Sequence, residues 1–445
     1  MEDTKPVTFP RALALAVVFG VLTAAAPDAM AKPLEEELSS ILIDHPNIRA
    51  GYKTIESSRQ DIAKARAGYF PTVAATGSGG PEYIDSPGER ARRANGKAWM
   101  RSKVLAGVTV TQNMFSGYAT AAAVKTARLN REIAEITLEG TRQSTMFEGI
   151  TAYIDVLRQK RLIELARTNE LTIERQLNLE DERVRRGSGI TVDVLQAKSR
   201  LQLAKERLIT FEGALEDAVS RYFQVFGHSP EIENMTDPVP PVNILPSGLE
   251  RALEISLTEN PAVGNSNTAV EMARESRTMV RSEYFPVVDL VGSWNYELNN
   301  NTVTGTRRDG AIVLSTNWTL FNGFTTRAGL TQATYNYRAS KDNFDYTNRK
   351  VVEQTKLAWQ ALLTSRLRLG LLENAINIAG EVFISRKRLR DAGKETVINV
   401  LDAESEVNNA QIDYTSASYD ERLAVYQLML AMGRLNAKYL GLPPI

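Results

Sequence analysis

The residues best suited to chemistry in this 445-residue chain are polar side chains at helical spacing. Asn399, Asp402 and Glu406 follow one another at intervals of three or four, which places them on one face of a helix. Asp193 and Gln196 hold the equivalent places in an earlier copy of the same stretch. Carboxylates on such a face attract cations and repel one another. The predicted chemistry is therefore electrostatic and involves no covalent step.

The sequence has few of the residues that covalent catalysis or metal binding requires. The chain has no cysteine, and its two histidines, His45 and His228, lie in unrelated local settings. Thiolate sites, disulfides, His-based triads and zinc clusters are therefore disfavoured. Basic and acidic residues balance at 53 each, so no net charge draws the chain to nucleic acid. We expect no enzyme activity, no cofactor and no metal.

Two copies of a seven-residue repeat, over residues 187–225 and 393–431, carry the polar faces. The first copy has two lines of residues seven apart: Val194, Leu201, Leu208, Leu215 and Tyr222, and Ala197, Ala204, Phe211, Ala218 and Val225. The second copy has Val400, Val407, Tyr414 and Leu428, and Ala403, Ala410, Ala417, Ala424 and Ala431. Apolar spacing of three then four is a coiled-coil seam, and small alanines let neighbouring helices approach closely. Both helices are expected to pack side by side with others, although simple dimerisation would use the same pattern.

The mature chain consists of two copies of one sequence repeat. Tyr69-Phe70-Pro71 matches Tyr284-Phe285-Pro286, and Phe115-Ser116-Gly117 matches Phe321-Asn322-Gly323. Glycines that precede the heptad helices also correspond, Gly187 with Gly393. We predict a first repeat at 32–229, a proline-rich linker at 230–247 and a second repeat at 248–445.

Each unit is expected to contain helix, two strands, a very long helix, a turn and a further helix. The first helices, 34–68 and 248–283, should end at the Tyr-Phe-Pro element, because proline disfavours a helical residue before it. The proline-free stretches 116–186 and 322–392 predict long helices of about 105 Å each at 1.5 Å per residue. The strands are expected at about 72–84 and 101–115, and at about 286–299 and 310–321.

Strict alternation marks three of the four strands. In the third strand, for example, Leu290, Trp294 and Tyr296 alternate with polar residues. This pattern is typical of a membrane β-barrel strand, although a half-buried hairpin of a soluble sheet has the same alternation. Four strands cannot close a barrel, and an open edge in lipid would leave backbone groups unpaired. If the barrel hypothesis is right, two, three or four copies must combine, with eight, twelve or sixteen strands.

The amino terminus predicts export. Arg11 precedes an apolar run over residues 12–26, and Ala29-Met30-Ala31 supplies the small residues that a signal peptidase requires. We expect residues 1–31 to be a signal peptide that is removed. The apolar run is short for a membrane span.

These features together resemble the TolC family of outer-membrane efflux and secretion proteins. The resemblance rests on the duplicated unit, on both Tyr-Phe-Pro and both Phe-x-Gly elements, and on Gly393 followed by Val400-Leu401-Asp402-Ala403. It implies a mainly α fold with a membrane β-barrel part. In that fold a homotrimer shares a twelve-strand β-barrel in the outer membrane, continuous with an α-helical coiled-coil barrel in the periplasm. It also implies a periplasmic adaptor (membrane fusion protein) and an inner-membrane transporter, of ABC or another type.

The resemblance also assigns roles at the far end of the helices. Asp402 and Asn399 match the family's acidic constriction positions, with Asp193 and Gln196 as their counterparts in the first repeat. The positions that latch the closed tip carry Arg390 and Glu395. Arg390 is expected either to pair with Asp193 as a latch or to remain, like Asp193, a solvated charge. The turns Gly187-Ser188-Gly189 and Gly393-Lys394 are expected to touch the adaptor.

The absent lipid-anchor cysteine and the Val-Leu-Asp-Ala sequence favour the type I secretion branch. The function predicted is a passive exit duct for secreted proteins or small molecules. The alternative is an exported soluble coiled-coil scaffold or adaptor with a small β-domain. In the insertion between the first two strands, Arg90, Arg92, Arg93 and Lys97 form either a solvated loop or a contact for lipopolysaccharide phosphates.

Overall fold

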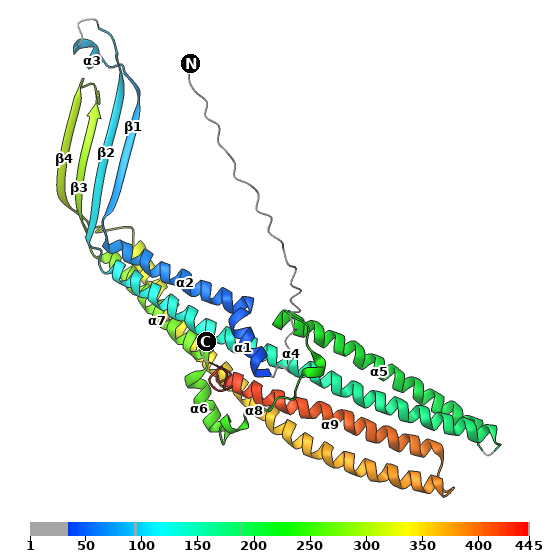
Figure 1. The fold of residues 1–445 in the computed structure, drawn as a ribbon. Helices are drawn as coiled ribbons and strands as arrows, with labels where there is room; N and C mark the ends of the chain where they lie inside the picture. The colour runs from blue at the N-terminus through cyan, green and yellow to red at the C-terminus, as the bar shows by residue number, and fades with distance from the viewer. Residues whose placement is uncertain (1–33, 93–95, 188, 444–445) are drawn as a thin grey trace, which may run out of the picture.

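A computed structural model describes residues 34–92, 96–187 and 189–443 of the chain. Long helices form an elongated bundle, and a four-stranded sheet projects from one end of it (Figure 1). The predicted signal peptide at 1–31 lies outside the described residues. The structure confirms the prediction of a mainly helical chain with few strands.

The first helix of each repeat is divided in two, where one continuous helix was expected. The first repeat has α1 (Leu34–Asp44) and α2 (Pro46–Arg66), and the second has α6 (Leu249–Glu259) and α7 (Pro261–Arg281). His45 and Asn260 occupy the breaks in extended conformation, and the side chain of each accepts a hydrogen bond from the backbone two residues on. Proline at the first helical position lacks the N–H that would continue the preceding helix. The prediction of single helices over 34–68 and 248–283 is therefore wrong.

Short 3₁₀ turns, η1 (Ala67–Tyr69) and η4 (Ser282–Tyr284), then lead from α2 and α7 into the sheet. The second strand of each repeat is followed by a sharp turn into the long helices α4 (Ala119–Arg185) and α8 (Thr325–Asp391), each of 67 residues. Gly117 has a φ of +59°, and a Cβ there would lie 2.5 Å from the carbonyl oxygen of Ser282. Only glycine fits this turn without a steric clash.

The heptad helices are α5 (Thr191–Phe226) and α9 (Val397–Ala431). Both apolar lines contribute buried residues; Ala197 and Ala218 of α5 and Val400 and Leu428 of α9 are at most 1% exposed. In the half of the bundle away from the sheet, the helices pack in the order α5, α4, α9, α8 (Figure 1). Nearer the sheet the order is α2, α4, α7, α8. Helix α8 therefore comes last in both orders and lies at one edge of the bundle, with α6 packed against part of it, and α2 and α5 share the opposite edge.

The sheet has the order β1-β2-β3-β4 and is antiparallel throughout. Its strands are β1 (Thr72–Ile84), β2 (Trp99–Phe115), β3 (Val287–Leu298) and β4 (Thr306–Asn317), with the short helix α3 (Pro87–Arg92) between the first two. The last strand lies about four residues earlier than the expected 310–321. Asn317 pairs with Val287, the first residue of β3, so residues after Asn317 have no strand beside them. The hairpin partner, rather than the apolar pattern, sets where β4 ends.

Candidate functional site

The two helical hairpins turn at the end of the bundle that lies farthest from the sheet (Figure 1). Gly187 and Gly393 adopt φ values of +75° and +73°, which favour glycine, and both are exposed. Gly189 is also required, because a Cβ there would lie 2.8 Å from the backbone nitrogen of Val184. Lys394 is exposed, and its N–H donates to the carbonyl of Leu389 at 2.8 Å. Ser188, expected at the same turn, lies outside the described residues.

The predicted constriction residues of the second repeat lie in the first turns of α9. The carboxylate of Asp402 pairs with Arg200 of α5 and is 47% exposed. The Asn399 side-chain amide donates to Glu395 at 2.5 Å, and the backbone carbonyl oxygen of Asn399 accepts from Arg386 at 3.2 Å. The hydrogen bond from Asn399, with one from the Thr396 backbone, holds the pKa of Glu395 below its usual value.

In the first repeat, Asp193 and Gln196 are half-buried in the first turns of α5. Asp193 and Gln196 correspond to Asn399 and Asp402 in their position along the helix. The contacts differ, because Asp402 and Arg200 connect the two hairpins directly.

The expected pairing of Arg390 with Asp193 is replaced by an ion pair with Glu180 of α4. Both partners are enclosed, with side chains 12% and 3% exposed. Glu180 also lies 3.4 Å from Arg183, whose side chain is 48% exposed. Arg390 is therefore buried against the other hairpin rather than facing the first turn of α5.

A second buried carboxylate lies on the same boundary. Glu404 of α9 is 8% exposed and accepts a hydrogen bond of 2.6 Å from the amide of Gln176 on α4. Burial raises the pKa of Glu404, and the Gln176 hydrogen bond and the charge of Lys387 oppose that shift. Burial therefore favours the protonated form of the Glu404 carboxyl.

Four of the polar contacts between the first hairpin and the second lie toward the ends of the hairpins, and we call these four the tip seam. They are Arg390 with Glu180, Glu404 with Gln176, Asp402 with Arg200, and Asn409 with Arg207. The apolar contact beside them is small, formed by Ala197, Val397, Leu401 and Leu177. Sequence analysis did not identify Glu180, Gln176, Glu404 or Arg200, because each meets a partner about 200 residues away in the chain.

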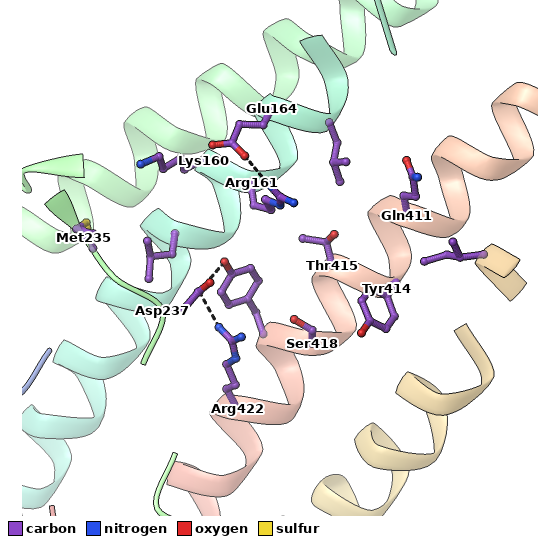
Figure 2. A pocket seen from close by; sticks show the side chains of 14 residues that line it. Lys160, Arg161, Glu164, Met235, Asp237, Gln411, Tyr414, Thr415, Ser418 and Arg422 are labelled. Carbon is purple, nitrogen blue, oxygen red and sulfur yellow. Dashed lines mark hydrogen bonds and ion pairs between the residues drawn. The ribbon is translucent and has the colours of Figure 1, made fainter. Parts of the chain in front are cut away.

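The linker crosses the middle of the bundle and is attached to both repeats. The carboxylate of Asp237 accepts hydrogen bonds from Tyr419 at 2.9 Å and from Arg422 at 2.7 Å, both on α9. Figure 2 shows these contacts in a pocket between α4 and α9, where Arg161 also pairs with Glu164. On α4, the hydroxyl of Tyr153 donates to the carbonyl of Thr236 at 3.1 Å. Arg422 and Arg161 each pair with a carboxylate of the pocket, and Lys160 lies 3.8 Å from Glu233 of the linker, which indicates a structural attachment.

The sheet has one apolar and one polar face. The apolar face carries Val108, Trp294, Leu290, Ile312 and Leu314, which share a side by register. Trp294 is 50% exposed and Ile312 80%. Polar pairs occupy the other face, where Asn113 donates to Asp289 at 2.8 Å and Lys103 to Glu82 at 3.0 Å.

In the part of the chain that the structure describes, the strands contact one another and the turn η1, and helices do not cover the apolar face (Figure 1). Among these residues no cluster of acidic or histidine side chains could hold a metal ion. Within residues 34–92, 96–187 and 189–443, no helix combines the length and apolar character that crossing a bilayer requires.

Comparison with known proteins gives consistent matches over most of the chain. The model of a family described as outer membrane efflux protein matches residues 38–228 and 252–434. Outer membrane efflux protein BepC of Brucella suis is 24% identical over 387 residues, 86% of this chain and 81% of that protein. Alkaline protease secretion protein AprF of Pseudomonas aeruginosa is 22% identical, covering 92% of this chain and 86% of its own. A membrane protein from Pseudomonas aeruginosa of known crystal structure has the same fold, with a TM-score of 0.79, 17% identity and 90% of each chain covered.

Proposed function

Because the chain belongs to the outer membrane efflux protein family, as its resemblance to the TolC family predicted, we propose that it forms a passive exit duct. The chain is an outer-membrane protein, as its family is. The duct serves type I secretion of proteins or efflux of small molecules. It works with a periplasmic adaptor and an inner-membrane transporter. The proteins that it resembles include an outer membrane efflux protein and a protease secretion protein, which supports keeping both kinds of cargo.

The observation that carries this proposal is the two-faced sheet with both edges open. An exposed apolar face suits lipid, and the polar face suits a water-filled lumen. Backbone groups on the edges of β1 and β4 need partners in a bilayer, because lipid supplies none. A second copy can supply them by pairing its β1 with β4 of the first. The same exposed face disfavours the alternative of a soluble scaffold.

The helices support closure by identical copies. Because α8 lies at one edge and α2 and α5 at the other, each copy presents α8 to the α2 and α5 of the next. Such a head-to-tail contact forms a closed ring when the rotation closes. Both edges expose apolar residues that a neighbour would cover. On α8 they are Leu357, Leu363, Leu367, Leu371, Ile378, Val382, Ile384 and Leu389, and on α5 they are Val192, Leu195, Leu203, Ile209 and Phe223. We propose three copies, and hence twelve strands, by resemblance to the family.

The division into repeats 32–229 and 248–445 joined by the linker 230–247 is part of the same proposal. In the assembled duct, the ends of the hairpins form the periplasmic entrance. Asp402 and Asn399, with Asp193 and Gln196 from the first repeat, line its constriction.

The tip seam closes the entrance. Arg390 acts as the latch through Glu180, and Glu395 orients Asn399. The turns Gly187-Ser188-Gly189 and Gly393-Lys394 contact the adaptor. The closing and latching roles require that the two hairpins can separate.

Single-channel recording in planar bilayers tests the proposal. Wild-type protein is expected to give small, cation-selective openings, and Asp402→Ala is expected to reduce the selectivity, because the exposed carboxylate attracts cations. Glu353→Ala is the control, because Glu353 is an exposed carboxylate of α8 that lies outside the polar face of α9. A folded, helical protein that neither inserts nor conducts would overturn the duct and favour the scaffold. Conductance with unchanged selectivity in Asp402→Ala would overturn only the constriction.

A further inference from the structure

One charged side chain interrupts the apolar face of the sheet. All other charged residues of the four strands lie on the polar face: Glu82, Arg101, Lys103, Asp289, Glu297, Arg307 and Asp309. Arg308 pairs in register with Tyr296, which in turn pairs with Ala106, and these positions belong to the apolar face. A lone cation on a face of this composition is costly in lipid unless it reaches a polar layer or an anion.

Arg308 has no carboxylate of its own. Its guanidinium lies 5.8 Å from the centre of the Tyr296 ring, and the side chain is exposed. Among the described residues Arg308 forms no ion pair, whereas Arg307 beside it lies 3.4 Å from Asp309 on the polar face. Two consecutive arginines thus point to opposite sides of one strand and have different electrostatic partners.

A neighbouring copy would not neutralise Arg308 through its strand. Under the proposed closure, β4 pairs with β1 of the next copy. The residues of β1 on the apolar face are Val73, Ala75, Gly77, Gly79, Pro81 and Tyr83, none of which is charged. The charge on Arg308 therefore remains available to the surroundings of the sheet.

The position of Arg308 along the strand corresponds to the membrane surface. Trp318, directly after β4 at the helical end, is exposed and its indole donates to the carbonyl of Tyr284 at 3.2 Å. Ten residues separate Trp318 from Arg308, which is about 33 Å along a strand at 3.3 Å per residue. A tilt of about 40° reduces this to about 25 Å, the height of the apolar band of outer-membrane barrels. Trp318 and the Arg308–Tyr296 pair thus lie at opposite surfaces of one band.

We infer that Arg308, held by the ring of Tyr296, binds a phosphate of lipid A in the leaflet remote from the helices. This inference rests on the proposed function, because it requires the apolar face to lie in the outer membrane. The helices mark the periplasmic side, so the opposite surface is the exterior leaflet, whose lipid A carries phosphates. The planar guanidinium donates two parallel hydrogen bonds to a phosphate.

Native mass spectrometry of the purified assembly tests this inference. The protein is titrated with bis-phosphorylated lipid A, with lipid A lacking both phosphates, and with phosphatidylglycerol. Arg308→Gln removes one basic residue from an anionic membrane surface. Its binding of the phosphorylated lipid should therefore be about fivefold weaker than that of the wild type. Arg308→Lys keeps the charge but not the paired hydrogen bonds, so its affinity should lie between those of Arg308→Gln and the wild type, and Arg307→Gln should match the wild type. Lipid A without phosphates should bind all variants equally.

Equal binding of phosphorylated lipid A by Arg308→Gln and wild type, or an equal loss in Arg307→Gln, would overturn the inference. Phosphatidylglycerol binding that depends equally on Arg308 would overturn the choice of lipid A. Conductance of the same preparations separates the two proposals, since Arg308 faces away from the lumen and its replacement should leave conductance unchanged. A conducting protein without Arg308-dependent binding loses this inference alone, and a protein that does not conduct loses the duct.

Discussion

Replacing Arg390 by alanine tests the closed tip most directly. The change leaves the Glu180 carboxylate, which is 3% exposed, without its buried partner. Removing one member of a buried ion pair costs about 3–5 kcal/mol. Glu180 keeps Arg183 at 3.4 Å, so the lower end of that range applies. About 3 kcal/mol would shift the balance between joined and separated hairpins by roughly 100-fold toward separation.

Two measurements report this shift. Single-channel recordings of Arg390→Ala should show larger or longer openings than wild type. Amide hydrogen exchange should be faster at the ends of α8 and α9 and unchanged near the sheet. Arg388→Ala is the matched control, because Arg388 is exposed, lies on the same turn of α8, and forms no ion pair among the described residues.

A double replacement isolates the pair from the loss of a side chain. Glu180→Gln together with Arg390→Ala should cost less than the sum of the two single changes, because each single change leaves one charge of the pair buried alone and the double change removes both charges. Wild-type exchange and conductance in Arg390→Ala would refute the role of this contact in closure. Strictly additive effects would show that the two side chains act independently.

Three further results are expected. Glu404→Gln should raise the unfolding temperature at neutral pH: the folded state raises the pKa of this carboxyl above its usual 4.5, so stability falls as pH rises from about 4.5 through the raised value. The replacement should flatten that pH dependence, and a profile parallel to wild type would contradict the assignment. Gly117→Ala should lower the unfolding temperature more than Gly323→Ala; both have positive φ, but only at Gly117 would the new Cβ meet a carbonyl, at 2.5 Å. Equal shifts would mean that the turn relaxes around the methyl group. Tyr419→Phe should cost about 1 kcal/mol in denaturant unfolding, because it removes a hydrogen bond to Asp237, and no loss would mean that the remaining arginine holds the linker alone.

Local chemistry accounts for the parts of the fold that the sequence predicted well. The absence of proline gave the long helices to within about three residues at each end. The breaks at His45 and Asn260 were missed, although an Asn or His before proline is a recognisable start of a helix. The end of β4 was also missed, because the partner strand sets it and the apolar residues continue beyond Asn317.

The candidate site was less predictable, because its contacts join distant parts of the chain. Heptads place Val400 and Ala403 on a seam, and both are buried. Nothing in that period indicates that Arg390 meets Glu180, since the pairing depends on how two separate hairpins lie together. The tip seam therefore depends on how the two hairpins pack in the fold, whereas each hairpin can be predicted from its own sequence.

The order of elements in space connects the sheet to the helices in one argument. Strand β4 leads into α8, and both lie at the same edge of the chain, while β1 follows α2 at the other. A neighbour that pairs with β4 therefore also meets α8, so one rotation between copies must satisfy both contacts. The turns at Gly117 and Gly323 set the orientation of the sheet relative to the long helices. That orientation decides whether one rotation can satisfy both the strand contact and the helix contact. Both glycines have positive φ, so the same kind of turn leads from the sheet into the long helix in each repeat.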